Sequence, residues 1–405
     1  MQPRFAVLLC SIVLMNAACS PRNIESDIQV IDLEGGFSRD GELKLSELVS
    51  DVELIQLKGV PEDKYIHHWT HSYFVGEDYI LVANGKPMEL FLFDRKGDFL
   101  RMIGQVGKGP GEFQNCEVHC FDSDEQRILV CDSYGKRLIQ YDITGQHILN
   151  RGMDYYSASG MNYVSDIICT ADNNFVLFNQ NPPADSINRL FILDDKLELI
   201  ETGINEKQIP DNVLFGSRAY TQSFSDYSVV YTPGVDTIYQ LKNRSLTPIA
   251  QMINIGEGNA KRQYSESDKS FVISKYLFHP KAHIFSLKQG NNTVTLAQRR
   301  TDSLSFRFGS EKNCSKVYRG NYGFENDLFA YSPISPNDIR TFNGLWSLLI
   351  HPETIGIISE IQGDIFACLE DSQVKYPKVL DHLIKLLRNQ GENAAPIIVV
   401  MTLAH

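Results

Sequence analysis

Short runs of alternating apolar and polar residues, separated by turns rich in Gly, Asn and Asp, recur along the chain from about residue 65. Such runs predict short β-strands. The clearest candidates fall into three groups of four: Ile66–Phe74, Tyr79–Ala83, Leu90–Asp94 and Phe99–Ile103; Val118–Asp122, Ile128–Asp132, Leu138–Asp142 and His147–Arg151; Asp166–Cys169, Phe175–Asn179, Leu190–Leu193 and Leu197–Glu201. Fainter groups cover Phe224–Gln251, Phe271–Leu304 and Cys314–Leu369. Four antiparallel strands form one blade of a β-propeller, so six groups predict an all-β, six-bladed propeller.

An internal repeat supports this architecture. The runs Phe91–Gly97 and Ile139–Gly145 each hold an apolar strand that ends in Asp and is followed by a Gly-bearing turn. Between them lies Gly104–Phe113, which is too rich in Gly to be a helix. A repeat of this length, built from strands, is typical of blades arranged around an axis.

The ends of a propeller must be joined, and one solution is a blade completed by strands from both termini. Ile28–Asp32 and Ile397–Met401 are candidates for this closure, although they could also be two unrelated edge strands. Val52–Leu57 also has the alternation of a strand. A short helix is predicted over Lys378–Asn389, whose apolar residues recur at helical spacing. This apolar face predicts packing against the blades more strongly than binding to a partner.

Composition and charge narrow the class of protein. The 405 residues are 43% hydrophobic and 22% charged, which is ordinary for a globular protein, and the net charge is -12. Without clustered Lys and Arg, this balance disfavours nucleic acid or an anionic membrane surface as the main partner. Residues 28–405 contain no long linker and are predicted to form one domain, the propeller.

The N-terminal segment predicts export. Residues 1–18 have a minimal basic region at Arg4 and an apolar stretch too short to span a bilayer, as in a removable signal peptide. Ala17 and Ala18 directly precede Cys19, which resembles a bacterial lipobox with Cys19 as the lipidated residue. Residues 19–27 would then form a lipid-anchored tether. An ordinary secretory signal cut nearby is the alternative, because Asn16 stands where lipoboxes usually have Leu.

With these features, the chain resembles the NHL-like, six-bladed β-propeller lipoproteins common in Bacteroidota. The likeness rests on Phe93–Phe113, with its G-x-x-G-x-G-P-G-E-F loop, on Leu45–Leu57, on Asp236–Leu241 and on the closing run Asn393–Val400. Ala394-Ala395, inserted before Pro396, departs from the family's closing run. The resemblance implies an exported protein found beside nutrient-uptake systems. Related propellers mostly bind proteins or other ligands, and a few are lactonases or lyases, so the fold does not fix the function.

The densest group of potential metal ligands is His67, His68 and His71. On a strand His67 and His71 would share one face, near the central channel if this is an innermost strand. They could hold part of a divalent metal site, although packing between blades explains them as well.

Other motifs favour structural roles. The Gly104–Gly111 loop lacks Walker spacing and predicts a tight turn rather than a phosphate site.

No standard zinc spacing fits the group of Cys116, His119, Cys120 and Cys131. Strand alternation would put Cys116 and Cys120 on one face, in buried packing. The six cysteines besides Cys10 and Cys19 are scattered along the chain, which favours a role as small buried side chains over disulfide formation. Asp122–Glu125 and Asp194-Asp195 predict solvated hairpin turns rather than calcium sites.

The sequence therefore predicts a membrane-anchored propeller that binds a protein partner or a small nutrient-derived ligand. We expect no nucleic-acid partner, no cofactor and no catalytic residue. Ser20–Asn23 lacks an acidic pair, which favours the periplasmic face over the cell surface. The alternative is a metal-dependent hydrolase or lyase at the central channel, with a divalent metal held partly by His67, His68 or His71.

Overall fold

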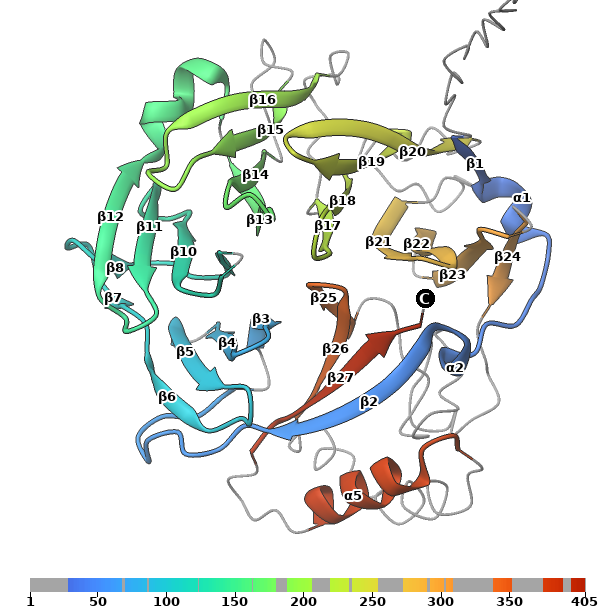
Figure 1. The fold of residues 1–405 in the computed structure, drawn as a ribbon, viewed down its shortest axis with the longest axis horizontal. Helices are drawn as coiled ribbons and strands as arrows, with labels where there is room; N and C mark the ends of the chain where they lie inside the picture. Colours follow the sequence, from blue (N-terminus) through green and yellow to red (C-terminus); the bar gives the residue numbers. More distant parts are fainter. Residues whose placement is uncertain are drawn as a thin grey trace, which may run out of the picture.

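The strands surround a common axis as the blades of a propeller (Figure 1). The structure, a computed structural model, describes residues 28–67, 70–85, 87–122, 124–161, 163–179, 188–205, 219–232, 235–253, 272–289, 292–301, 304–308, 338–351, 374–388 and 395–404. Within these residues, six antiparallel four-stranded sheets form the ring, and we number them as blades 1–6. The predicted all-β, six-bladed propeller is confirmed.

From axis to rim, blade 1 contains β25 (Arg340–Phe342), β26 (Leu345–Ile350), β27 (Ile397–Leu403) and β2 (Val49–Gln56). Blade 2 contains β3 (Thr70–Val75), β4 (Tyr79–Asn84), β5 (Glu89–Asp94) and β6 (Phe99–Met102). Blade 3 contains β9 (Val118–Phe121), β10 (Arg127–Asp132), β11 (Arg137–Asp142) and β12 (His147–Gly152). Between blades 2 and 3, β7 (Gln105–Val106) pairs with β8 (Glu112–Phe113).

Blade 4 contains β13 (Val164–Cys169), β14 (Phe175–Asn179), β15 (Asn188–Leu193) and β16 (Leu199–Asn205). Blade 5 contains β17 (Tyr220–Ser223), β18 (Ser228–Tyr231), β19 (Thr237–Lys242) and β20 (Ser245–Ile253). Blade 6 contains β21 (Val272–His279), β22 (Ala282–Gln289), β23 (Asn292–Arg299) and β24 (Ser305–Phe308). The clear strand groups predicted blades 2–4 to within a few residues. The fainter groups overlap blades 5, 6 and 1, and much of the last group lies outside the described residues.

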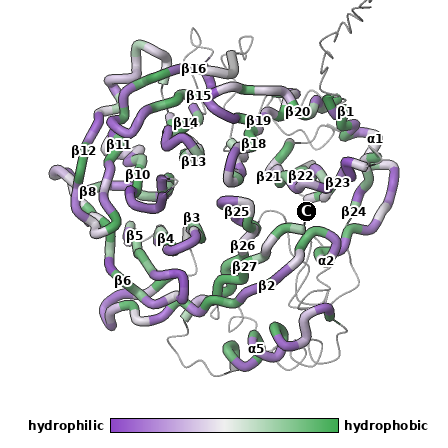
Figure 2. The backbone as a smooth tube through the Cα atoms, viewed as in Figure 1, coloured by the Kyte–Doolittle hydropathy of each residue, from purple (hydrophilic) through white to green (hydrophobic). Residues whose placement is uncertain are grey.

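The ring closes in blade 1, where segments from the two ends of the sequence lie side by side (Figure 1). β27 runs antiparallel between β2 and β26, with Val399 opposite Leu54 and Leu348. Figure 2 shows that β27 is hydrophobic over most of its length. The prediction that Ile397–Met401 closes the ring is confirmed. Its predicted partner, Ile28–Asp32, is wrong, because β2 is long enough to match β27 and leads directly into blade 2.

Residues 29–32 instead form β1 (Gln29–Asp32), which pairs in parallel with β20 as a fifth strand at the rim of blade 5. Ile31 is buried in the apolar core between blades 5 and 6. His283, in blade 6, hydrogen-bonds Gln29 Oε1 through Nε2 at 3.1 Å, and its Nδ1 lies 2.8 Å from the Tyr276 hydroxyl. Burial lowers the pKa of His283 to about 3, so the ring stays neutral. These contacts fix β1 to the rim.

Six apolar clusters fill the spaces between neighbouring blades. Because both faces of each blade are covered, the middle strands carry nearly continuous apolar runs, as in Ile80–Ala83 and Leu90–Phe93. Each fully buried aliphatic or aromatic side chain contributes about 1.5–3 kcal/mol relative to an exposed one. The blades are therefore held by packing against each other rather than by a single central core.

Four short helices accompany the strands in the described residues: α1 (Leu33–Phe37), α2 (Leu45–Leu48), the 3-10 helix η1 (Met153–Ser159) and α5 (Pro377–Arg388). In α5, Leu380, Leu383 and Ile384 are buried in the cluster between blades 1 and 6. The predicted helix and its packing against the blades are confirmed. None of the described helices has the length and apolar character needed to cross a membrane.

Candidate functional site

One face of the propeller is formed by the segments that lead into the inner strands and by the turns between second and third strands. We call this surface in blades 2–4 the connector face, and define it as residues 57–67, 103–117, 133–136, 153–161 and Tyr163. Its backbone is irregular, so its shape depends on side chains that bind the loops to the blades.

A repeated amide or carboxylate supplies this fixation. The last residue of the second strand in each of these blades is buried and polar: Asn84 in β4, Asp132 in β10 and Asn179 in β14. Each side-chain oxygen accepts a hydrogen bond from a backbone N–H just before the inner strand. The donors are His67 N at 3.1 Å, Asn115 N at 3.0 Å and Tyr163 N at 3.2 Å, respectively.

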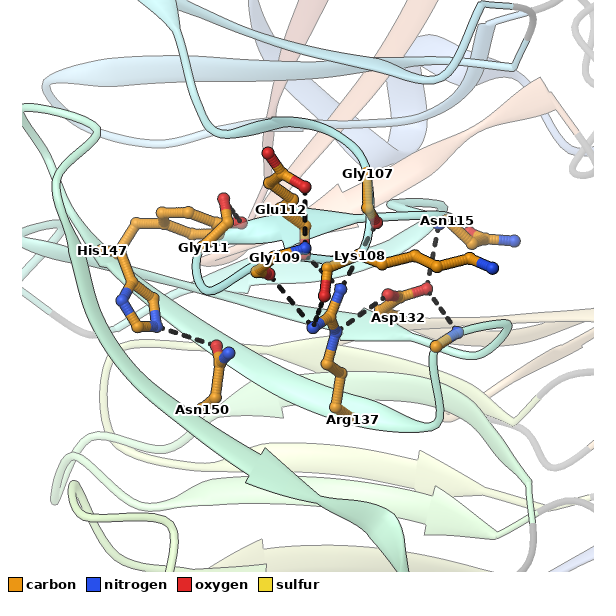
Figure 3. Close-up of polar contacts among 12 residues, drawn as sticks. Gly107, Lys108, Gly109, Gly111, Glu112, Asn115, Asp132, Arg137, His147 and Asn150 are labelled. Carbon is orange, nitrogen blue, oxygen red and sulfur yellow. Dashed lines mark hydrogen bonds and ion pairs between the residues drawn. The ribbon is translucent and has the colours of Figure 1, made fainter.

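Blade 3 adds a charged clamp on the Gly-rich loop (Figure 3). Arg137 Nε donates to the Asp132 carboxylate at 3.2 Å. The other guanidinium nitrogens donate to four loop carbonyls, those of Gly107 at 3.4 Å, Lys108 at 3.1 Å, Gly109 at 3.2 Å and Glu112 at 2.7 Å. One planar guanidinium can satisfy these acceptors because its donors are fixed in a fork. Asp132 is fully buried, so the charge of Arg137 also compensates a buried carboxylate.

The loop itself is the tight turn that its glycines predicted. Gly104 and Gly111 have φ values of 62° and 70°, in the left-handed region that side chains disfavour. A Cβ at Gly104 would lie 2.7 Å from the Tyr141 hydroxyl. Glu112 Oε2 accepts the Gly109 N–H at 2.7 Å, and this hydrogen bond lowers the pKa of the Glu112 carboxyl. The sequence signature therefore encodes loop geometry in this protein.

Four tyrosines of the connector face are exposed. Tyr155, at 51%, is bound by its neighbours, because its hydroxyl donates to Glu198 and its ring packs on the Arg151 guanidinium. The other three rings project from the fixed backbone into solvent. Tyr65, Tyr134 and Tyr163 are 58%, 66% and 40% exposed, and they come from blades 2, 3 and 4. Each tyrosine lies close to one of the three hydrogen bonds that fix the loops. Tyr65 is two residues before His67, Tyr134 is two residues after Asp132, and Tyr163 is itself a donor through its backbone N–H. Tyrosine is enriched at protein interfaces because it offers a large amphipathic surface with few rotatable bonds. This arrangement makes the connector face the candidate binding site.

A second ion pair supports the connector face in blade 2. Lys64 Nζ lies 2.6 Å from the buried Glu89 carboxylate, which raises the pKa of Lys64. Asn84 Nδ2 donates to the Tyr65 carbonyl at 2.8 Å. The pair joins the segment before β3 to the start of β5, as Arg137 joins the Gly-rich loop to blade 3.

The histidines predicted as possible metal ligands are only partly described. His67 is half-buried before β3, which begins at Thr70, and its ring lies 5.4 Å from that of Tyr65. His68 lies outside the described residues, and for His71 the structure describes only the backbone, in β3. Within the described ranges, no group of three or more His, Cys, Asp and Glu side chains is placed to hold a metal. The metal site remains a prediction, and Cys19 also lies outside the described residues.

Near the axis, hydroxyl groups connect the inner strands of different blades. Ser72 Oγ donates to the Glu117 carbonyl at 2.7 Å, and Thr221 Oγ1 donates to Asp166 Oδ2 at 2.8 Å. Thr341 Oγ1 donates to the Thr221 carbonyl at 3.0 Å, so β25 of blade 1 lies directly against β17 of blade 5. These hydroxyls hold the inner strands together.

Of the four described cysteines predicted as buried packing groups, three are buried, and Cys169 is half-buried at the edge of the cluster between blades 3 and 4. Cys116, Cys120 and Cys131 are free and buried, and burial raises the pKa of all three thiols, that of Cys131 to about 12. The expectation that Cys116 and Cys120 share a face is wrong. Cys116 packs between blades 2 and 3 and Cys120 between blades 3 and 4, because β9 begins only at Val118 and alternation does not extend back to Cys116.

The acidic turn of blade 3 also differs from its prediction as solvated. Asp122 and Glu125 are buried, and Asp122 pairs with Arg127 at 2.8 Å. The Glu125 carboxylate accepts N–H groups from the first turn of blade 2, those of Glu77, Asp78 and Tyr79. Burial raises the pKa of Glu125 although these hydrogen bonds oppose the shift. The residue therefore joins two blades rather than facing solvent.

Sequence reasoning missed the repeated clamp and the exposed tyrosines. Asp132 and Asn179 each close a predicted second strand, and Asn84 directly follows one, so their similar position in the repeat was an available signal. The tyrosines carry no such signal. Tyr141 is fully buried and Tyr134 is exposed, although they lie in the same blade seven residues apart.

The fold and this surface place the chain among six-bladed propellers. A family model described as "Domain of unknown function (DUF4934)" matches residues 28–402, so the chain belongs to that family. No curated protein matches the sequence.

Comparison with solved structures gives matches of low sequence identity. A Bacteroides fragilis protein thought to be exported is 14% identical with a TM-score of 0.61, and the match covers 93% of this chain and 100% of that one. A DUF4221-family member from Bacteroides vulgatus is 12% identical with a TM-score of 0.46, covering 88% and 97%. A Bacteroides thetaiotaomicron protein of unknown function is 10% identical with a TM-score of 0.41, covering 90% and 73%. At these identities, the first of the three supports the propeller fold alone.

Proposed function

We propose that this protein is an exported lipoprotein, anchored through Cys19, whose propeller binds a partner at the connector face. The observation that carries the proposal is the set of Tyr65, Tyr134 and Tyr163, exposed on loops that buried side chains hold in place. A loop that is already ordered loses little conformational entropy when it binds. Exposed aromatic rings on a rigid backbone are therefore suited to recognition.

The spread of the rings favours a protein as the partner. They come from three consecutive blades, so a partner that contacts all three must itself present a broad surface. A small nutrient-derived ligand would engage fewer of the rings. The resemblance to NHL-like lipoproteins found beside uptake systems supports a partner that belongs to such a system, and the residues after Cys19 favour the periplasmic face.

Recovery of the partner from membranes of the native cell tests the binding role. A Tyr65→Ala/Tyr134→Ala/Tyr163→Ala variant should recover at least about tenfold less partner than the parent, a loss of about 1.4 kcal/mol or more. The matched control is Leu100→Ala/Ile148→Ala/Ile200→Ala, which removes exposed apolar side chains from the outer strands of the same three blades. Equal loss in both variants, or in neither, contradicts the proposal.

Intact mass of the membrane-extracted protein tests the anchor. The parent should carry acyl chains on Cys19, and Cys19→Ala should lose both the added mass and the membrane association. An unacylated parent would contradict the lipid anchor while leaving the connector face open to its own test.

A further inference from the structure

The rim of blade 5 carries an exposed apolar surface where the described chain begins. Along β1, Gln29 and Ile31 face blade 6, whereas Ile28, just before the strand, and Val30 point outward and are 42% and 50% exposed. In the parallel register with β20, Val30 lies opposite Gln251 and Asp32 opposite Ile253, so the exposed Ile253 lies on the same outer face. These residues, Ile28, Val30 and Ile253, form what we call the rim patch.

The distance along the chain limits what can cover the rim patch. Ile28 is nine residues after Cys19, and a fully extended chain spans at most about 3.3–3.6 Å per residue, or roughly 30 Å here. A domain of 378 residues (28–405) has a radius of gyration of about 21 Å, which corresponds to a compact body roughly 55 Å across. A lipid on Cys19 therefore keeps the rim patch within roughly 30 Å of the bilayer, whereas the opposite rim can lie much farther away.

We propose that the rim patch rests on the surface of the lipid bilayer, so that the propeller stands edge-on to the membrane. This inference depends on the lipid anchor in the proposed function. The clamped position of β1 favours it, because His283 and Gln298 hold the strand with its apolar side outward, Gln298 Nε2 donating to the Val30 carbonyl at 2.9 Å. An edge-on propeller presents its connector face sideways, where it stays open to a partner in the same membrane.

Spin labels at two matched positions test the orientation. Val30→Cys and Ile148→Cys replace residues that are 50% and 49% exposed in the parent, and they lie in β1 at the rim of blade 5 and in β12 at the rim of blade 3, with blade 4 between them (Figure 1). Each full-length, acylated variant carries a nitroxide and is reconstituted in vesicles of phosphatidylethanolamine and phosphatidylglycerol. The unsubstituted protein, treated in parallel, gives the background labelling of its own cysteines.

Power saturation by oxygen and by a water-soluble nickel complex reports lipid contact at each label. We expect the ratio of oxygen to nickel accessibility to be several-fold higher at position 30 than at position 148. Equal ratios in protein whose intact mass shows acylation would overturn the edge-on orientation and leave the lipid anchor standing. Protein without acyl mass would overturn the anchor, and the orientation with it.

Discussion

Blades 1 and 3 both pack against their neighbours through apolar clusters, but they differ in the interactions added to that packing. In blade 1, β27 closes the ring through strand pairing and six buried apolar residues, from Ile397 to Leu403. In blade 3, charged side chains bind loops to the sheet, as Arg137 does for the Gly-rich loop and Glu125 for the first turn of blade 2. Apolar pairing is strong but does not specify loop geometry, whereas hydrogen bonds to backbone groups fix it. The ring is therefore closed by packing, and the connector face is shaped by hydrogen bonds from buried polar and charged side chains.

The stability of the ring should be most sensitive to substitutions in β27, the apolar strand that closes it. Val399→Asp places a charge between Leu54 and Leu348 at a fully buried position of β27, and should cost more than about 5 kcal/mol, enough to unfold a domain of ordinary stability. Thr402→Lys introduces a charge at the exposed residue of the same strand, opposite Asp51, and should change stability by less than about 0.5 kcal/mol. Denaturant unfolding of both variants measures the difference in stability. Equal effects would contradict closure of the ring by the buried side chains of β27.

The charged clamp should come next in sensitivity. Arg137→Ala leaves the buried Asp132 carboxylate uncompensated and should lower the free energy of unfolding by about 3–5 kcal/mol. Arg137→Lys keeps the charge but lacks the planar fork, so we expect it to lower the free energy of unfolding by less than Arg137→Ala does. Chemical denaturation separates the three proteins. If Arg137→Ala is as stable as the parent, the clamp does not shape this loop.

The contact between β1 and blade 6 should depend on pH. Burial lowers the pKa of His283 to about 3, from 6.5. Below about pH 6.5 the unfolded chain therefore binds a proton at this histidine and the folded chain does not. The stabilising effect of the neutral ring is full above this pH and is lost as pH falls toward 3, by up to a few kcal/mol. Relative to His283→Gln, the parent should lose stability on acidification. Parallel pH profiles of the two proteins would exclude this role.

The smallest effect on stability should come from the connector-face tyrosines. The triple variant Tyr65→Ala/Tyr134→Ala/Tyr163→Ala should change the free energy of unfolding by about 0.5 kcal/mol or less per site, because the three rings project into solvent. Thermal unfolding measures this change beside the binding loss. A destabilisation of several kcal/mol would assign the rings to the fold instead of to recognition.

The sequence predicted the repeat but not the pairing across it. The apolar pattern identifies β2, β4 and β27 as strands, because β2 alternates over most of its length and β4 and β27 are short continuous apolar runs. It does not say which strand lies beside β27, since that choice depends on which segment continues into the next blade. For the same reason Ile28–Asp32 was a reasonable but wrong partner.

The candidate site was less predictable than the fold. The Gly-rich loop was visible as a turn, yet its fixation by Arg137 joins residues about thirty positions apart. Exposure of Tyr65, Tyr134 and Tyr163 depends on where each loop leaves the sheet, which a periodic pattern does not report. His67 was expected on a strand, but β3 begins three residues later, after the segment that Asn84 holds.

The most direct test of the central claim is photocrosslinking in intact cells from position 134, with position 148 as the control. Both sites are exposed, one on the connector face and the other on the outer strand of the same blade. A photoreactive phenylalanine at 134 should give a discrete crosslinked partner that is absent from 148. A partner crosslinked from 148 and not from 134 would contradict recognition at the connector face.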